Sequence, residues 1–284
     1  TFMMVGFLNG ISSGAGVVAA TFFGAGDRGN LHRTVHTMVA FGLAFGLVMT
    51  LLGALLSPQI LSWMDTPESV MEEAVTYLQI YFSGSLGLVM YNIFVGILQA
   101  VGDSRHPLYY LIFSSFLNLV LDLLFIGVFH MGVGGAAIAT VISQAASAVL
   151  CFLLLRKAEE SYRLSIREIR FDRKILGQII RLGFPAGAQN SIISFANIIV
   201  QSHINAFGEM VMAGYGAYTK IEGFGFLPII SFMMALTTFV GQNLGARQYD
   251  RVRKGARFGI LMSALLAELI GLAIFLLAPY LIAA

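Results

Sequence analysis

The chain has 284 residues, of which 57% are hydrophobic and only 11% are charged. Water-soluble domains carry about 25% charged residues, so this composition excludes an ordinary soluble domain and indicates a surface that faces lipid. The net charge of +2 gives no sign of a nucleic-acid partner, and the single cysteine excludes an internal disulfide and a cysteine-based metal site.

Eight long apolar stretches, separated by short polar segments, predict eight transmembrane helices. A helix needs about 20 apolar residues to cross a bilayer, whereas barrel strands need only about 9–11 and alternate in polarity. The expected spans are Thr1–Phe23, Val35–Leu61, Val75–Val101, Leu108–Phe129, Gly135–Leu155, Ile179–Phe207, Val211–Leu244 and Phe258–Ala283. The predicted fold class is therefore an all-α polytopic membrane protein.

The basic residues support both the number of spans and their orientation. Sixteen of the seventeen Lys and Arg residues fall in every second connection, and the other connections carry acidic residues such as Glu68 and Glu72. An excess of basic residues marks cytoplasmic loops, so the basic connections are expected to be cytoplasmic. The longest of them, 157–178, is interpreted as a solvated linker, with binding to lipid headgroups as the alternative.

An internal repeat has an offset of 221 residues. Phe23-Gly24-Ala25 resembles Leu244-Gly245-Ala246, and Leu55-Leu56-Ser57-Pro58 resembles Leu276-Leu277-Ala278-Pro279. Six helices per period would give parallel copies, related by an axis along the membrane normal. The expected whole is therefore twelve helices in two parallel six-helix lobes. The chain would supply residues 1–156 of the N-terminal lobe (helices 2–6) and 179–284 of the C-terminal lobe (helices 7–9), lacking the first helix and the last three.

Asp122 is the strongest candidate for chemistry because it lies in the middle of an apolar span. An ionised carboxylate at that depth costs about 2.5–3.5 kcal/mol, so a functional reason is expected. Asn118 lies one turn earlier on the same face, and Thr140 begins a second polar stripe in the next span. Carboxylate, amide and hydroxyl oxygens can bind either a proton or Na⁺. The alternative is a buried polar cluster that only holds the helices together.

Another polar stripe runs along the sixth span, with Asn190, Ser194, Asn197 and Gln201 at helical spacing. This face is expected to point away from lipid, either to line a substrate cavity or to form interhelical hydrogen bonds.

Four further residues are assigned to the expected substrate cavity. Tyr81 and Asn92 are expected to line its opposite side, since aromatic and polar groups suit flat organic cations. Lys220 and Glu222 are intramembrane charges, for which a functional role and a structural ion pair are both open.

Several motifs, in order and spacing, resemble the multidrug and toxic compound extrusion (MATE) transporters. They are Phe23-Gly24-Ala25-Gly26-Asp27, Gly102-Asp103-Ser104-Arg105-His106-Pro107, Asn118-Leu119-Val120-Leu121-Asp122, Gly183-Phe184-Pro185, Ile204-Asn205-Ala206-Phe207-Gly208 and Val240-Gly241-Gln242-Asn243-Leu244-Gly245-Ala246. The resemblance implies drug efflux driven by H⁺ or Na⁺, with Asn118, Asp122 and Thr140 matching the N-lobe cation site. Ile193 stands where the NorM branch has a glutamate, which favours a DinF-like member.

Other classes of function find less support in the sequence. No G-x-x-x-x-G-K-[ST] motif is present, so transport should be secondary, without a cofactor, and an intramembrane enzyme would need convergent acid and base groups that are not visible. A lipid-linked oligosaccharide flippase is the nearest alternative.

The five histidines show no ligand spacing and are expected to be interfacial residues. Na⁺ at Asp122 is therefore the one metal ion considered. The protein is expected to be a monomer in the inner membrane of a bacterium or archaeon, with drugs or toxic metabolites and the lipid bilayer as its partners.

Overall fold

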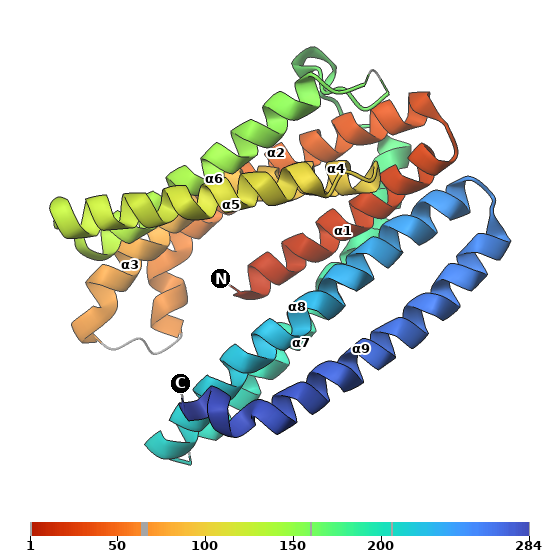
Figure 1. The fold of residues 1–284 in the computed structure, drawn as a ribbon. Helices are drawn as coiled ribbons and strands as arrows, with labels where there is room; N and C mark the ends of the chain where they lie inside the picture. The colour runs from red at the N-terminus through yellow and green to blue at the C-terminus, as the bar shows by residue number, and fades with distance from the viewer. Residues whose placement is uncertain (1, 64–67, 160, 206, 284) are drawn as a thin grey trace. The chain divides into compact units, whose positions relative to one another are not determined.

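The computed structural model describes residues 2–63, 68–159, 161–205 and 207–283, and no strand occurs among them (Figure 1). The elements are α1 (Phe2–Gly24), α2 (Arg28–Trp63), α3 (Glu68–Ser83), α4 (Ser85–Ala100), α5 (Arg105–Asp122), the π-helix η1 (Leu123–Val128), α6 (Gly132–Arg156), the short 3₁₀ helix η2 (Ile166–Glu168), α7 (Arg173–Asn205), α8 (Glu209–Gly245) and α9 (Tyr249–Ala283).

Each of the eight predicted spans coincides with a helix or a pair of helices, which confirms the predicted fold class. Within the described part of the chain, five helices are long and apolar enough to cross a bilayer, and six if the bent pair α3–α4 is one span. α7 is not among them, because its stripe of amides and hydroxyls lowers its apolarity. Four helices begin six or more residues earlier than predicted, namely α2 at Arg28, α3 at Glu68, α7 at Arg173 and α9 at Tyr249. Charged residues end an apolar stretch without ending a helix.

The predicted span Val75–Val101 is formed by two helices with a bend between them. The chain bends by 45° between α3 and α4, and Gly84 lies at the bend as the residue that precedes α4. A Cβ atom at Gly84 would collide with the side chain of Val141 on α6. The bend therefore sits where α6 approaches so closely that a side chain at position 84 has no room.

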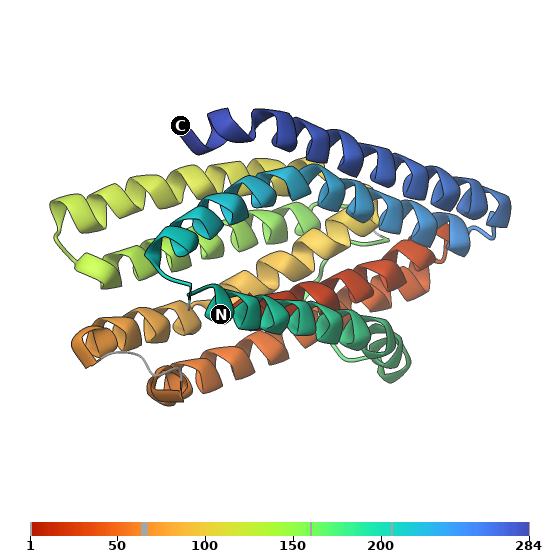
Figure 2. The ribbon, with the colours of Figure 1, turned by 90° about the horizontal axis from the view of Figure 1, so that it is seen from below.

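The chain divides into two compact units, which are described separately. One unit, the α2–α6 bundle, runs from Arg28 to Arg181. In it, α6 packs against α3, α4 and α5, and α2 packs against α3 and α4. The other unit, the α1–α9 bundle, joins the segment up to Asp27 with the segment from Leu182 onward. There α8 lies beside both α1 and α9 (Figures 1 and 2). The expected lobe boundaries of a whole two-lobe protein stay a prediction.

Glycine lets α1 and α7 approach within the α1–α9 bundle. A Cβ atom at Gly10 would collide with the backbone of Gly187, and one at Gly14 with the backbone of Gly183. In lipid, helix association depends on such close packing, because burying apolar surface gains little when the surroundings are equally apolar. The glycines of these two helices therefore act as a packing surface.

The two segments related by the offset of 221 residues end in the same turn. After α1, the amides of Ala25, Gly26 and Asp27 donate to carbonyls four, three and five residues earlier. After α8, the amides of Ala246, Arg247 and Gln248 make the same three bonds at the same offsets. The central residue is left-handed in both copies, with φ of 66° at Gly26 and 57° at Arg247. This is the glycine-type helix C-cap. The same cap also follows α4, where the amides of Val101, Gly102 and Asp103 make the three bonds and φ of Gly102 is 92°.

The contacts between α1 and α8 are reciprocal. A Cβ atom at Gly24 would collide with Gln242, and one at Gly245 would collide with Thr21. Gln242 and Gly245 are the repeat counterparts of Thr21 and Gly24, so each copy presents the same surface to the other. A contact of this kind is the signature of a two-fold axis. Gly241 meets its own counterpart, Ala20, where a built Cβ would lie 3.0 Å from the Cβ of Ala20, so the local axis passes beside this pair.

The segment between α6 and α7, predicted to be a solvated linker, is docked onto α2 at a few buried points, and most of its other side chains are exposed. Leu164, Ile175 and Ile179 are 2%, 3% and 0% exposed. The amide of Ser165 donates to His36 Nε2 at 3.1 Å, and the amide of Asp172 donates to the Thr37 hydroxyl at 3.1 Å. His36 and Thr37 are themselves buried within α2. Apolar anchors and buried polar partners that are distant in the sequence hold the segment, and such pairings cannot be read from an apolar pattern.

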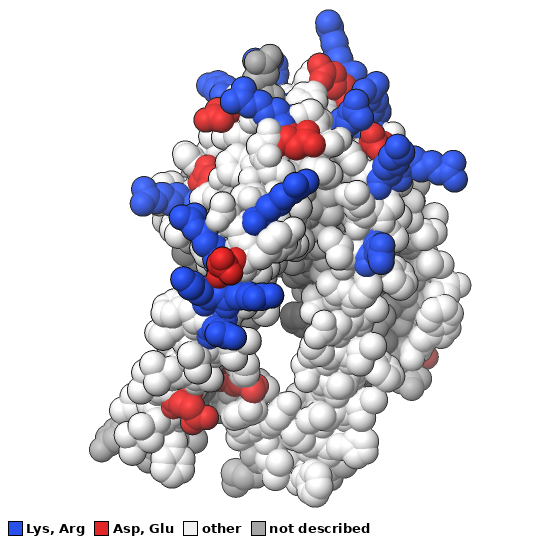
Figure 3. Space-filling view, turned by 90° about the vertical axis from the view of Figure 1, so that its right-hand side faces the viewer, with Lys and Arg blue, Asp and Glu red and all other residues white. Residues whose placement is uncertain are grey.

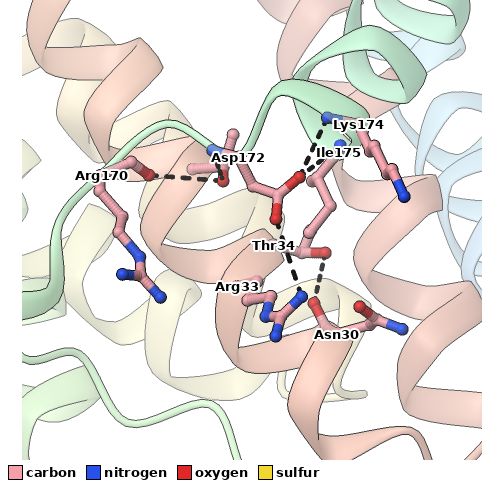
Figure 4. A network of polar contacts seen from close by, with 8 residues as sticks. Asn30, Arg33, Thr34, Arg170, Asp172, Lys174 and Ile175 are labelled. Atoms are coloured by element: carbon pink, nitrogen blue, oxygen red, sulfur yellow. Dashed lines mark hydrogen bonds and ion pairs between the residues drawn. The ribbon is translucent and has the colours of Figure 1, made fainter.

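Asp172 joins this docked segment to the start of α7 (Figure 4). Its Oδ1 accepts from the amides of Lys174 at 3.0 Å and Ile175 at 3.2 Å, which is the arrangement of a helix N-cap. Its Oδ2 lies 3.9 Å from the Arg33 guanidinium on α2. One carboxylate therefore caps α7 and pairs with α2 at the same time.

The charged side chains follow the distribution expected from the sequence. In Figure 3, Lys and Arg gather over the upper part of the visible face, and the lower part is almost free of them. The apolar surface between charged regions is extensive, with α9 residues such as Ile260, Leu261 and Phe275 68–77% exposed. Such exposure of large apolar side chains suits a helix that faces lipid.

Candidate functional site

The α5–α6 hairpin carries the three residues predicted to bind a coupling cation, here called the α5–α6 polar site (Asn118, Asp122 and Thr140). The hydroxyl of Ser114 on α5 donates to the carbonyl of Ser143 on α6 at 2.7 Å and sets the register of the hairpin. Because the helices are antiparallel, one turn onward along α5 matches one turn back along α6. Asn118 therefore lies at the level of Ala139 and Thr140, with Asp122 one turn further.

Two atoms of this site have no hydrogen-bond partner. Asn118 Nδ2 and Asp122 Oδ1 are buried and unpaired, as judged within the described residues. Unpaired buried polar atoms are rare in native structures, and each costs about 1–3 kcal/mol. Turning the Asn118 amide over would direct its oxygen to the same place, since amide nitrogen and oxygen are assigned from their surroundings. A proton or a small cation would satisfy the two oxygens.

Thr140 adds a third oxygen on the facing helix. Its hydroxyl donates to the carbonyl of Ala136 at 3.0 Å, so the proton is used within α6 and the oxygen lone pairs stay available. The three side chains are all half-buried. An acid, an amide and a hydroxyl at adjoining levels of one helix pair can bind a proton or a hard cation.

A π-helix begins directly after Asp122, a feature that the sequence did not predict. η1 covers Leu123–Val128, and the amide of Phe129 donates to the carbonyl of Leu124, five residues earlier. π-helical turns are rare and are frequent at functional sites. The widened turn packs against α6, where a Cβ atom at Gly135 would lie 3.0 Å from the Cβ of Phe125. The π-helix η1 thus directly follows Asp122 in the sequence and, like Asp122, belongs to the α5–α6 hairpin.

The polar stripe of α7 divides into an inner and an outer half. Asn190 Nδ2 donates to the carbonyl of Gly6 on α1 at 3.1 Å, and the Ser194 hydroxyl donates to the carbonyl of Asn190 at 2.9 Å. Asn190 thus makes the interhelical hydrogen bond that was one of the two alternatives for this stripe. Asn197 and Gln201, further along, are exposed.

The remaining cavity candidates lie in both units. Glu222 on α8 accepts a 2.7 Å hydrogen bond from the Tyr218 hydroxyl one turn earlier, while Lys220 is exposed. Tyr81 on α3 is half-buried and stacks with Tyr77, with ring centroids 6.2 Å apart. Asn92 on α4 donates to the carbonyl of Leu88 at 2.8 Å. The predicted substrate-cavity residues stay a prediction, because each is described within its own unit.

Long apolar helices around a buried polar site define this protein as an α-helical, multi-pass membrane protein. The family model MatE matches residues 1–124 and 185–284, and the chain therefore belongs to the MatE family. Members of this family are transporters and not enzymes, and the chain is accordingly a multi-pass protein of the plasma membrane.

Curated relatives are multidrug resistance proteins by name. The chain is 29% identical over 281 residues to the probable multidrug resistance protein YoeA of Bacillus subtilis, covering 96% of this chain and 61% of YoeA. It is 36% identical over 201 residues to the probable multidrug resistance protein YpnP of the same organism, covering 70% of this chain and 44% of YpnP. The chain thus spans roughly three-fifths or less of these relatives. Whether it is DinF-like, as expected, stays a prediction.

Solved structures share the fold. A crystal structure of MATE in the bent conformation superimposes with a TM-score of 0.90 at 25% identity, covering 98% of this chain and 63% of that one. A transporter of the MOP superfamily from Pyrococcus furiosus superimposes with a TM-score of 0.89 at 25% identity, covering 99% of this chain and 62% of that one. That transporter is described as having a binding pocket of reversed polarity, which suggests a different function for it.

Proposed function

We propose that the whole protein exports organic, often cationic, compounds in exchange for H⁺ or Na⁺, and that the α5–α6 polar site binds the coupling ion. The observation that carries this proposal is the pair of buried, unpaired atoms on Asn118 and Asp122. A site that held the helices together would have its polar atoms paired with one another. Unpaired oxygens in an apolar span instead suit a ligand that arrives and leaves. The names of YoeA and YpnP support multidrug efflux as the activity.

The proposed exchange rests on reciprocal linkage. A cation bound at Asp122 disfavours drug binding, and the bound drug disfavours the cation by the same factor. One positive charge that enters down a potential of 100 mV supplies about 2.3 kcal/mol, which supports about a 50-fold gradient of a neutral substrate. Asn190, Ser194, Asn197, Gln201, Tyr81, Asn92, Lys220 and Glu222 are proposed to line the substrate cavity.

The experiment measures ethidium efflux from cells that express the full-length gene, with the proton and sodium gradients collapsed in turn. Asp122→Asn keeps the size of the side chain but cannot take up and release a proton, and we expect it to abolish gradient-driven efflux with normal membrane insertion. Glu72→Gln, at an exposed carboxylate of α3, is the matched control and should retain efflux.

Three outcomes bear on the proposal. Loss of efflux in Asp122→Asn alone supports the site, and the gradient whose collapse stops the wild type identifies the ion. Wild-type rates in Asp122→Asn would refute the coupling role of Asp122. Absence of wild-type efflux under every gradient would refute drug export and favour a lipid-linked oligosaccharide substrate.

A further inference from the structure

Two histidines and a glutamate converge where the docked segment crosses α2. His32 and His36 are one helical turn apart, with ring centroids separated by 4.3 Å. Glu168 ends the short helix η2, and its Oε2 lies 3.2 Å from His32 Nε2. One ligand atom of each residue can be chosen so that all three lie within 4.8 Å of one another. The histidines were expected to have no ligand spacing, and the structure contradicts this for the pair at i and i+4.

The tautomer of His36 prepares its outer nitrogen for coordination. His36 Nδ1 lies 2.8 Å from the carbonyl of His32, and a carbonyl can only accept, so Nδ1 carries the proton. Nε2 therefore has a free lone pair, which accepts from the amide of Ser165 at 3.1 Å. A ring N–H donated to a backbone carbonyl is the usual support of a histidine that binds metal through its other nitrogen.

The cluster opens into a cavity that leaves room for further ligands. The cavity has a volume of about 450 Å³, and its lining includes His32, Glu168, Glu159, Arg28 and Arg163. Water molecules or Glu159 could complete a coordination sphere from this side. The positive charges of Arg28 and Arg163 repel a bound cation and lower the affinity of the site for it.

We propose that His32, His36 and Glu168 form a site for a divalent transition-metal ion, with Zn²⁺ as the ion that two imidazoles and one carboxylate suit best. Zn–N and Zn–O bonds of about 2.0–2.2 Å place ligand atoms about 3.3–3.6 Å apart in a tetrahedron, so the most distant donor atoms must approach by about 1–1.5 Å. The side chains of His32 and Glu168 are 32% and 56% exposed and have room to move.

Zinc and the docked segment compete for one lone pair. His36 Nε2 bonds to the Ser165 amide in this structure, so the ion must take the place of that amide. Glu168, two residues after the start of η2, is bound by the ion at the same time. Occupancy therefore frees the backbone at Ser165 while it ties Glu168 to α2, which changes how the connection between α6 and α7 is anchored.

The experiment titrates Zn²⁺ into the metal-free, full-length protein, purified without a histidine tag, and follows binding by calorimetry. We expect one ion per chain. His32→Ala and Glu168→Gln should each weaken binding at least about tenfold, since each removes a ligand. His106→Ala is the matched control, because His106 also pairs with a carboxylate, Asp103, at 2.6 Å but lies outside the cluster. Arg163→Gln should tighten binding about two- to fivefold by removing a repulsive charge.

Two structural readouts separate coordination from a general effect on folding. X-ray absorption at the zinc edge should show two imidazole ligands in the wild type and one in His32→Ala. Amide exchange at Ser165 should become faster on addition of Zn²⁺. The proposal is overturned by binding that is unaffected in His32→Ala and Glu168→Gln, by equal weakening in His106→Ala, or by unchanged exchange at Ser165 with zinc bound.

Discussion

The reciprocal contact between α1 and α8 makes a strong prediction about Gly245. Gly245 is the last residue of α8. Glycine within a helix is usually worse than alanine by about 0.5–1 kcal/mol, so a change to alanine where there is room normally stabilises. A Cβ atom at Gly245, however, would collide with the carbonyl of Thr21, well inside the 3.0 Å that real Cβ atoms keep. Overpacking of this kind costs about 1–3 kcal/mol. We therefore expect Gly245→Ala to lower the stability of the protein by about 0.5–2 kcal/mol.

The assay is thermal unfolding of the purified full-length protein in a mild detergent. Gly223→Ala on the same helix is the control, because nothing lies within 4 Å of a Cβ atom there. It should match or exceed the wild type in stability. Gly24→Ala should cost about as much as Gly245→Ala, since it meets Gln242 in the equivalent contact. The double variant should lose less than the sum, because the first methyl group already separates the helices.

A Gly245→Ala protein as stable as Gly223→Ala would refute the reasoning. It would mean that α1 and α8 can separate at this point without loss of packing. Strictly additive losses in the double variant would refute the two-fold contact, because they would mean that the two glycines act at independent places.

Three further predictions concern the C-cap, the docked segment and the α5–α6 hairpin. Arg247→Gly should raise the thermal stability by about 1 kcal/mol, because φ of 57° strains a residue with a Cβ atom, and an unchanged midpoint would contradict this. Thr37→Val removes the oxygen that accepts from the Asp172 amide, a loss of about 1–3 kcal/mol, so tryptic cleavage between α6 and α7 should become faster. Thr76→Val, at an exposed position of α3, should leave the cleavage rate unchanged. Ser114→Ala should lower stability by about 1 kcal/mol through loss of its bond to Ser143, which thermal unfolding beside Ser83→Ala would test.

The sequence by itself determined the class of fold and the approximate place of each span. Apolar stretches of more than twenty residues have few other stable arrangements, because backbone groups in lipid must pair within the segment. The offset of 221 residues was also visible, and it anticipated the repeated turn at Gly26 and Arg247. Asp122 could be singled out because an acid at membrane depth is costly.

Other features depended on contacts between residues that are distant in the sequence. The bend at Gly84 depends on Val141, and the docking of the segment after α6 depends on His36 and Thr37, more than 125 residues earlier in the chain. An apolar pattern records which residues avoid water but not which partner they meet.

The same limit applies to the two candidate sites. Asn118 and Asp122 were visible as a polar face, but only the structure showed that two of their atoms are buried and unpaired. The i and i+4 spacing of His32 and His36 was available in the sequence, whereas Glu168 joins them only because the segment folds back over α2. Helical periodicity brings residues of one helix to a common face, and tertiary packing alone supplies the ligand from another segment.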